Sequence, residues 1–566
     1  MRQSRWVLLF AVLLLTVVGA WLWWVRPKNV DMTTYAPADS LLYLESNRPI
    51  EVIDAITGTQ AWKELANADR SQSAQPQSHW LRGFIRWTGI GPIKSVILAR
   101  AQVAVVVTDL RAVEEGDSLN IKSEVALLIE THTSERRIRA TFEEAIKALA
   151  EKTYGRPTFR RVTIEGVEYN EFIAPGGSRQ IVGAVLGSLV IIGTSEHIVQ
   201  DCLAVSQGRR PSLNGDPELR SMRLKLEKGS SLTFGYVPPA NSARLLAVGL
   251  PVLLGRAPGD SEFQRVITSG ASKVFGSLGW TSSTYLTGIE DQYLISLQPS
   301  VVEHLKPTFV ANSVNSQITR VLPEQVYSVT SYRFANPAAA WISLKTAVSS
   351  QVDALSAIVF SSLLKSTLLS YGIDDPESFL GAVKGELLTI RLDQTEERSM
   401  LMAGVHNRAA LHQFLSRRMS VKSRKAGGGL EIFEDQTGDF AAALNDDFIV
   451  IGSPADVRYY ALPDGTNLMS AETRKRMTFF LSFPTSGNVV TYTNDSDRVR
   501  GFVSAINSAK DGPTQAPRNM DEAIATLPYS STETTLGERG IERTTRSPLG
   551  QFSTLVPLLF PQPPSR

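Results

Sequence analysis

The sequence predicts an α+β protein in which an N-terminal transmembrane helix is followed by two homologous modules with mainly antiparallel sheets. Three observations support this prediction. The run from Trp6 to Val25 carries no charge, a series of landmarks recurs in the same order in both halves of the chain, and short strand patterns outnumber long helical ones. Strand patterns that follow each other through tight links favour antiparallel pairing.

The composition is that of a globular protein too long for a single core. The chain has 566 residues, 43% of them hydrophobic and 20% charged, so we expect two or more cores. Its 58 basic and 56 acidic residues give a net charge of +2, which provides no basic field to attract nucleic acid. Cys202 is the single cysteine, which excludes an intramolecular disulfide, and no metal or cofactor is predicted.

The run from Trp6 to Val25 is predicted to be a signal anchor. At about 1.5 Å per residue, a helix of this length crosses the roughly 30 Å hydrocarbon core of a bilayer. Residues 1–5 then lie in the cytoplasm, and residues 26–34 link the membrane to a chain whose bulk is exported. The alternative is a secreted protein, because Val18-Gly19-Ala20 satisfies the small-residue rule for signal-peptide cleavage.

The clearest internal repeat is a strand that ends at glycine. Leu189-Val190-Ile191-Ile192-Gly193 is followed by Thr194, and Phe448-Ile449-Val450-Ile451-Gly452 is followed by Ser453. A β-branched run of this kind, followed by a hydroxyl residue, predicts a buried strand that enters a capped helix. The repeat divides the chain into a first module at 35–306, a connector at 307–320 and a second module at 321–548.

Other landmarks repeat in the same order along the chain. They are Pro37 and Pro323, Gly89 and Gly372, Val103 and Leu387, His132 and His406, Gly166 and Gly429, Tyr236 and Tyr492, and Gly288 and Gly540. The offset between copies falls from 286 at the first pair to 252 at the last, as expected when the second copy has lost loop residues. Two arrangements remain open: two domains in tandem, or two halves that share one sheet.

The end of the chain, 549–566, is apolar at first and then rich in proline. Its apolar part is too short to span a bilayer, so we expect a final packing helix or an interfacial segment.

Two histidines are candidates for a paired site. His132 and His406 each follow a strand and precede a helix at equivalent points of the two modules. Repetition suggests a site at the junction of the modules, whereas polar residues that enter helices commonly satisfy local backbone groups. Both interpretations stay open at this point.

Basic residues near the hairpin of each module are candidates for ligand contacts. Arg160 and Arg161 lie in the first copy, and Arg417 and Arg418 precede the corresponding hairpin of the second. Anionic lipid head groups or cell-wall polymers could bind there, or the charges could simply be solvated near helix C-termini.

Known catalytic motifs are incomplete. Ser362 and Lys365 have the spacing of penicillin-binding serine enzymes, but the companion motifs of those enzymes are missing from the sequence. Cys202 lies on an apolar helix face, which indicates a core residue and not a nucleophile. Whether the chain has any enzymatic activity stays open, and a non-catalytic role is favoured.

Four features of the chain carry a family resemblance: the N-terminal anchor, the start at Tyr35-Ala36-Pro37-Ala38-Asp39-Ser40, the repeated strand and the segment Gly540-Ile541-Glu542. In these features the chain resembles an uncharacterised family of bacterial membrane-anchored proteins, catalogued as a domain of unknown function. The resemblance implies a bacterial origin and an exported region, so we expect a single pass through the bacterial inner membrane with the bulk of the chain in the periplasm. It supplies no catalytic residues.

Together these features predict a non-catalytic binding or scaffold protein of the cell envelope. Its expected partners are the bilayer, through residues 6–25, and an envelope protein, lipid or polymer, but not nucleic acid. The alternative is a cell-envelope hydrolase with a site assembled from scattered residues.

Overall fold

A computed structural model gives the positions of most of the chain. The described residues are 29–68, 100–115, 118–164, 166–177, 179–227, 229, 231–253, 268–310, 322–324, 326–395, 398–424, 429–460, 469–480, 487–508 and 519–559.

Within the described ranges, each half of the chain contains ten strands and several helices. The strands of the first half are β1 (Leu42–Ser46), β2 (Gln102–Glu115), β3 (Ser118–Glu130), β4 (Thr158–Ile164), β5 (Val167–Ile173), β6 (Gln180–Leu186), β7 (Leu189–Gly193), β8 (Thr233–Val237), β9 (Phe275–Tyr285) and β10 (Gly288–Leu297). The helices are η1 (Met32–Tyr35), α2 (Pro49–Gly58), α3 (Gln60–Ala68), α6 (Glu135–Tyr154), α7 (Glu196–Ser206), η3 (Leu213–Gly215), α8 (Pro217–Leu226), α9 (Pro239–Leu253) and α11 (Pro299–Leu305).

The second half contains another ten strands. They are β11 (Ser328–Arg333), β12 (Val383–Arg391), β13 (Ser399–Val405), β14 (Met419–Arg424), β15 (Glu431–Asp435), β16 (Ala441–Leu444), β17 (Phe448–Gly452), β18 (Val489–Thr493), β19 (Ser530–Leu536) and β20 (Gly540–Ser547). The helices are α12 (Pro337–Ser349), α13 (Ala354–Leu369), α14 (Pro376–Ala382), α15 (Arg408–Ser416), α16 (Pro454–Tyr460), α17 (Ala471–Met477), α18 (Ser496–Ser508), α19 (Met520–Thr526) and α20 (Phe552–Leu559).

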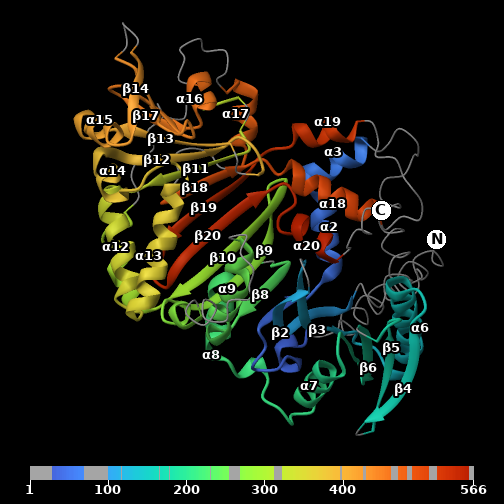
Figure 1. Ribbon diagram of the computed structural model, residues 1–566. Coiled ribbons are helices and arrows are strands. Elements are labelled where there is room, and N and C mark those ends of the chain that lie inside the picture. The colour runs from blue at the N-terminus through green and yellow to red at the C-terminus, as the bar shows by residue number, and fades with distance from the viewer. Residues whose placement is uncertain are drawn as a thin grey trace, which may run out of the picture.

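All these strands belong to one 20-stranded sheet (Figure 1). Its spatial order is β4-β5-β6-β7-β3-β2-β1-β8-β9-β10 for the first half, followed by β20-β19-β18-β11-β12-β13-β17-β16-β15-β14 for the second. Every pairing within the described ranges is antiparallel. The second half repeats the first strand for strand, in reverse direction across the sheet.

The structure corrects the predicted fold class, an N-terminal transmembrane helix followed by two homologous modules with mainly antiparallel sheets. The described strands of both halves form one antiparallel sheet and not a separate sheet for each module. The last strand of each half, β10 and β20, would be an open edge in a separate module, and pairing them removes both edges. The predicted transmembrane helix, Trp6 to Val25, lies outside the described residues. Among the helices that the structure does describe, none is both long and apolar enough to cross a membrane.

The β10–β20 ladder relates the halves by an approximate twofold axis. It pairs eight residues of each strand, from Ile289 opposite Ser547 to Ser296 opposite Gly540. Gln292 pairs with Thr544, which lies 252 residues later in the chain, and the same offset separates Gly288 from Gly540. The axis therefore passes between Gln292 and Thr544.

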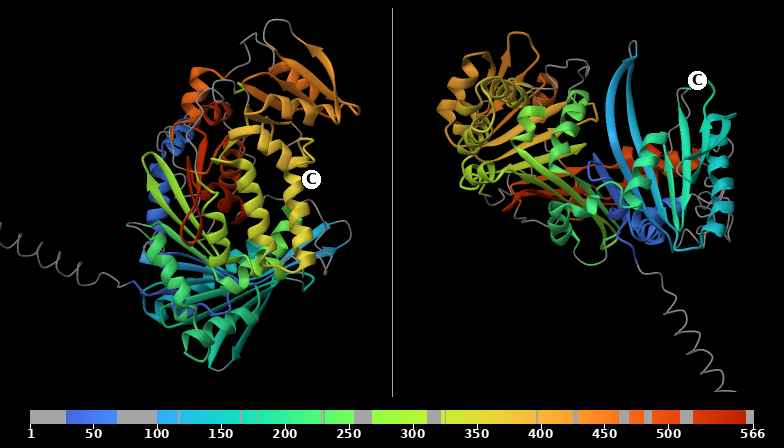
Figure 2. Two further views of the ribbon diagram at one scale, coloured as in Figure 1. Left: turned by 90° about the vertical axis from the view of Figure 1, so that its left-hand side faces the viewer. Right: turned by 90° about the horizontal axis from the view of Figure 1, so that it is seen from below.

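Helices cover both faces of the sheet in each half (Figures 1 and 2). On one face, η1, α7 and α8 enclose a core with Ala104, Val106 and Leu128, and the equivalent core of the second half includes Leu388 and Ile390. On the other face α6 packs over β5–β7, and α12, α14 and α15 pack over the second half. The β2–β3 hairpin extends far beyond its neighbours because its strands are 14 and 13 residues long.

Two further cores lie at the junction and contain residues of both halves. Around Ile289, α2 and α3 of the first half pack with α18, α19 and α20 of the second. Around Ile541, the residue equivalent to Ile289, α11 of the first half packs with α12 of the second. The halves thus share buried apolar surface at the junction as well as backbone hydrogen bonds, in addition to the cores that lie within each half.

The structure describes parts of the predicted linker and of the predicted tail. Met32 and Thr33, assigned to the linker 26–34, are fully buried, and Val30 exchanges backbone hydrogen bonds with the Gln102 side chain at 2.7 and 2.8 Å. In the tail 549–566, Leu549 and Phe552 are buried at the junction, and α20 packs on α18, so this part is a packing helix. Residues 560–566 lie outside the described residues.

The junction can be tested at Gly540, whose φ of 142° lies in the region that favours glycine. A Cβ there would lie 2.2 Å from the Ile295 carbonyl oxygen, a backbone atom that cannot move without breaking the ladder. We expect Gly540→Ala to lower the free energy of unfolding by about 2–4 kcal/mol, measured by urea denaturation. Gly381→Ala is the control, since a Cβ on Gly381 meets nothing within 4 Å. Equal stability of the two variants would contradict the role of the ladder.

Candidate functional site

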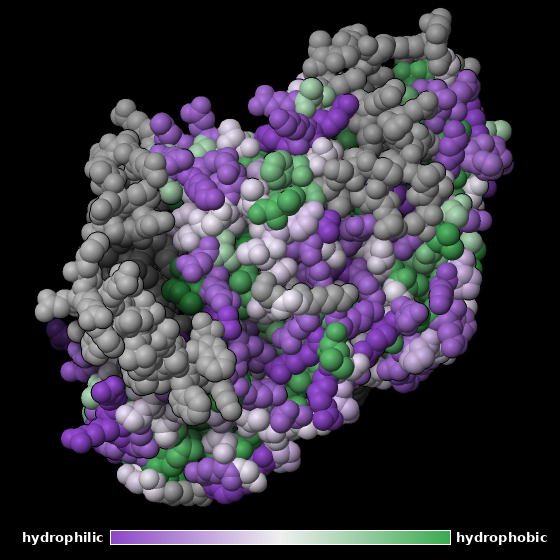
Figure 3. All heavy atoms as spheres, turned by 180° about the vertical axis from the view of Figure 1, so that it is seen from behind, coloured by the Kyte–Doolittle hydropathy of each residue, from purple (hydrophilic) through white to green (hydrophobic). Residues whose placement is uncertain are grey.

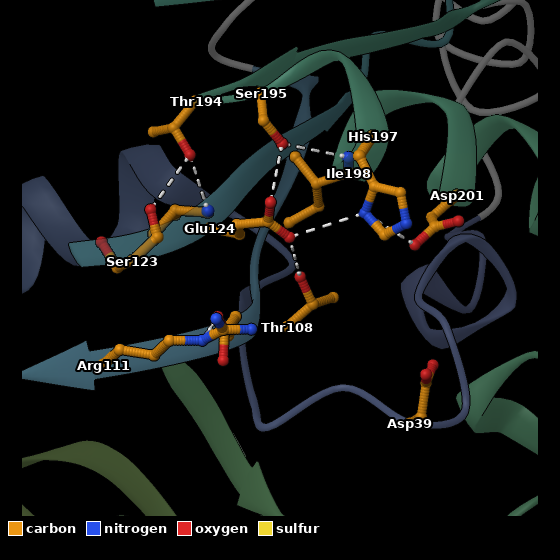
Figure 4. A network of polar contacts seen from close by, with 12 residues as sticks. Asp39, Thr108, Arg111, Ser123, Glu124, Thr194, Ser195, His197, Ile198 and Asp201 are labelled. Carbon is orange, nitrogen blue, oxygen red and sulfur yellow. Dashed lines mark hydrogen bonds and ion pairs between the residues drawn. The ribbon is translucent and has the colours of Figure 1, made fainter. Parts of the chain in front are cut away.

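A cluster of titratable side chains lies where β3 meets the first turns of α7 (Figure 4). We call it the α7 cluster and define it as Glu124, Ser195, His197, Asp201 and Arg210. Glu124 comes from β3, Ser195 precedes α7, His197 and Asp201 lie on α7, and Arg210 follows it. Segments that are far apart in the sequence therefore build this site.

The local fold brings the strand end and the helix start together. A Cβ on Gly193, the last residue of β7, would lie 2.6 Å from a methyl group of Val199 and 2.9 Å from one of Ile198, so only glycine allows this close approach. The Thr194 hydroxyl accepts the backbone N–H of Val125 at 3.0 Å. The Ser195 hydroxyl accepts the Ile198 N–H at 3.3 Å and caps α7.

Glu124 is the acceptor at the centre of the cluster. Its Oε1 accepts the Ser195 hydroxyl at 3.3 Å, and its Oε2 accepts the Thr108 hydroxyl at 3.5 Å. The Nδ1 of His197 lies 3.5 Å from Glu124 Oε2 and 3.6 Å from Asp201 Oδ2, so the imidazole is placed between two carboxylates. His197 is 69% exposed.

Arg210 joins the other end of the cluster to the start of the module. It contacts Asp201 and lies 2.7 Å from Asp39, which belongs to the segment before β1. Burial alone would lower the pKa of Arg210, but the hydrogen bond and the charge of Asp201 raise it. Arg210 therefore stays cationic and fixes the C-terminal side of α7.

This geometry does not assemble a nucleophile. The Ser195 hydroxyl donates to Glu124 and receives the Ile198 N–H, and no hydrogen bond joins it to His197 within the described residues. Across the part of the chain that the structure describes, no three histidine, cysteine or acidic side chains are arranged to hold a metal ion. The chemistry available to the α7 cluster is ion pairing between strand and helix.

The second half has an ion pair of opposite polarity at the equivalent position. Met400 pairs with Gly452 as Ala126 pairs with Gly193, so Arg398 corresponds to Glu124 and Asp456 to His197. Arg398 lies 2.6 Å from Asp456, which also accepts the Ser453 hydroxyl at 2.8 Å. Both halves thus place an acidic and a basic side chain between the strand and the helix at this position, with the order of acid and base exchanged.

The structure separates the two histidines proposed as a paired site. His132 has a φ of 52°, and its backbone N–H donates to Glu130 Oε1 at 2.9 Å. His406 is exposed, and its N–H donates to the Ala382 carbonyl at 3.0 Å. Ten strands lie between β3 and β13, or about 50 Å along the sheet at about 4.8 Å per strand. Each histidine satisfies local groups, and no shared site forms.

The four candidate arginines are paired with acids. Arg160 lies 2.8 Å from Glu171, and Arg161 lies 2.9 Å from Glu168. In the second half, Arg418 lies 2.8 Å from Asp374, and Arg417 lies 3.9 Å from Asp375. These pairs neutralise much of the positive charge that an anionic ligand would need.

The motif residues occupy ordinary structural positions. Cys202 is fully buried on α7, and burial raises the pKa of its thiol to about 12, so it is a core residue. Ser362 and Lys365 are exposed on α13, where no described side chain completes a catalytic set around them.

Sequence patterns did not reveal a buried polar pair at the end of β1 and β11. In the first half, Gln102 Nε2 donates to Asn47 Oδ1 at 2.6 Å. The equivalent residues of the second half are Glu386 and Arg333, whose Oε1 and Nε atoms are 3.7 Å apart. Aligned copies would show the two positions as polar, but their contact depends on the pairing of strands far apart in sequence.

Asp291 is a second buried group without a sequence signal. Its Oδ1 accepts the Trp280 indole N–H at 3.1 Å and the Ser282 hydroxyl, and its Oδ2 accepts the Gln551 N–H at 3.0 Å. Burial raises the pKa of its carboxyl to about 6, against hydrogen bonds that act in the opposite direction. Asp291 thereby ties the segment before α20 to β10, next to the junction.

Comparisons with known proteins found two solved structures of low similarity. No protein-family model matches the chain, and no curated protein matches it. Two solved structures are similar over part of it. The match to "Structure of crystal form IV of TP0453" spans 48% of this chain and 81% of that chain, with 13% sequence identity and a TM-score of 0.23. The match to "Structure of crystal form I of TP0453" spans 48% of this chain and 79% of that chain, with 11% sequence identity and a TM-score of 0.22. At these TM-scores the likeness carries no argument about fold or function.

The two equivalent ion pairs make a matched test of stability. Arg398→Ala leaves the buried Asp456 with Ser453 alone, and we expect a loss of about 1–3 kcal/mol of unfolding free energy. His197→Ala removes an exposed side chain and should change it by about 0.5 kcal/mol or less. Urea denaturation of both variants measures the difference. An equal or larger effect of His197→Ala would contradict a purely structural role for this pair.

Asp291 should make stability depend on pH. Its folded pKa of about 6 lies above the unfolded value of 3.8, so the folded state binds more protons between these values and stability falls as pH rises through this window. The shift corresponds to roughly 3 kcal/mol. Asp291→Asn should remove this dependence of the unfolding free energy on pH, measured by urea denaturation between pH 4 and 7. The variant also loses the hydrogen bond that the Gln551 N–H donates to Asp291. A slope unchanged in the variant would assign the pH dependence to other groups.

Proposed function

We propose that this chain is a non-catalytic binding or scaffold protein of the bacterial cell envelope. One observation carries the proposal: the histidine cluster of the first half is matched by Arg398 and Asp456 in the second. In the second half Arg398 and Ser453 both donate to Asp456, so the contact common to the two halves joins a strand to a helix.

The continuous sheet supports a scaffold role. The β10–β20 ladder and the two junction cores hold equivalent surfaces of the halves at a fixed separation. On the face in Figure 3, hydrophobic side chains lie in small groups among hydrophilic ones. Such a surface fits binding through small patches and not through one large apolar face.

Features of the sequence support export. The run from Trp6 to Val25 lacks charge, and one cysteine in 566 residues fits a protein that functions outside the cytoplasm without disulfides. An envelope protein, lipid or polymer is the proposed partner class.

Co-purification from detergent-solubilised membranes separates binding from catalysis. We expect the full chain to retain an envelope component in a fixed ratio, and the double variant Glu124→Gln/His197→Asn to retain the same component in the same ratio. The variant replaces the Glu124 carboxylate and the His197 imidazole with neutral amides, while Asp201 and Arg210 keep their ion pair. A component that accumulates only on the variant would behave as an uncleaved substrate and would contradict the proposal, as would the absence of any retained component.

A further inference from the structure

We propose that the turn between β9 and β10, together with the end of α17, is a docking surface for anionic lipid head groups. This tip surface is defined by Leu286, Arg474, Lys475 and Phe479. We thereby narrow the proposed partner class to anionic lipid at this surface, and the inference rests on the proposed envelope role.

Leu286 is both exposed and strained. It is the first residue of a two-residue turn, closed by the pairing of Tyr285 with Gly288. Its φ is 48°, in the left-handed region that disfavours bulky side chains, and 77% of it is exposed. Glycine or asparagine would remove the strain in such a turn, so the leucine is not explained by turn formation.

Contacts on both sides fix the turn. The Thr287 carbonyl accepts the Gln60 N–H at 2.8 Å. The Arg546 guanidinium lies over the Tyr285 ring, 4.6 Å from its centroid, and 2.7 Å from Glu290. Leu286 is therefore exposed to solvent on a turn whose flanking residues are fixed by these contacts.

Phe479 lies beside the turn. A Cβ on Gly288 would be 2.8 Å from Cε1 of Phe480, so the Phe480 ring rests on the start of β10. Phe479 packs edge-on against Phe480 with ring centroids 5.0 Å apart, and it is 46% exposed. An aliphatic and an aromatic side chain thus project from adjoining segments.

Basic residues precede this apolar pair. Helix α17 carries Glu472 in its first turn and three basic residues in its last. Arg476 donates to the Leu527 carbonyl, whereas Arg474 and Lys475 are exposed and make no ion pair with the described residues. Basic side chains next to exposed aromatic and aliphatic groups are typical of binding at the interface of an anionic membrane.

The equivalent turn of the other half shows that the fold does not require this chemistry. Between β19 and β20, Arg539 donates to Ser221 and Glu218 on α8, so that turn is polar and neutralised. The positive charges of Arg474 and Lys475 complement an anionic lipid surface, and this complementarity is the reason for choosing lipid as the occupant of the tip surface.

A fluorescent probe can report on the tip surface alone. The native Cys202 is fully buried, so Leu286→Cys offers one exposed thiol for an environment-sensitive label. Leu224→Cys, at an 85% exposed site on α8, is the control. In the full chain mixed with phosphatidylglycerol vesicles, we expect a blue shift and quenching by spin-labelled lipid at 286 but not at 224. A label at 286 that stays aqueous, or responds equally to phosphatidylcholine, would overturn the proposal.

Charge variants supply a second, independent measurement. In the labelled chain, Arg474→Gln/Lys475→Gln should weaken the 286 response to phosphatidylglycerol by about tenfold or more in half-saturating lipid concentration. Arg136→Gln/Arg137→Gln removes another consecutive pair of exposed arginines, on α6, and should leave the response unchanged. Equal effects of the two double variants would show a general charge effect and overturn the site.

Discussion

The structure depends on the backbone ladder between β10 and β20. These strands would be edges in two separate modules, and an edge exposes a row of unpaired N–H and C=O groups. Pairing them around the axis between Gln292 and Thr544 satisfies both rows and creates one sheet. The junction cores around Ile289 and Ile541 then bury helices from both halves together, so the two halves behave as one folded body.

The two halves keep contacts but change the chemistry that makes them. Glu124 and His197 occupy the positions of Arg398 and Asp456, and Asn47 and Gln102 those of Arg333 and Glu386. In each case a polar pair is present, while charge and polarity differ. A pair that fastens backbone segments needs complementary partners and no particular acid or base, which is why these sites support a structural interpretation.

Local patterns predicted individual elements well. Gly193 and Gly452 end β7 and β17, Tyr236 and Tyr492 lie in β8 and β18, and Gly288 and Gly540 begin β10 and β20. The positions of the candidate site residues relative to one another did not follow from local patterns. His132 and His406 are equivalent in sequence but lie far apart on the sheet, and the arginines face acids that a linear pattern cannot place beside them.

The sequence by itself determined short local features, such as the strands that end at Gly193 and Gly452 and those that begin at Gly288 and Gly540, because strand and helix periods are local properties. Tertiary structure alone decided that the halves share one sheet, that Asp291 is buried beside the junction, and that Leu286 and Phe479 project from adjoining segments. These outcomes depend on hydrogen bonds and packing between segments hundreds of residues apart, for which short-range periodicity carries no signal.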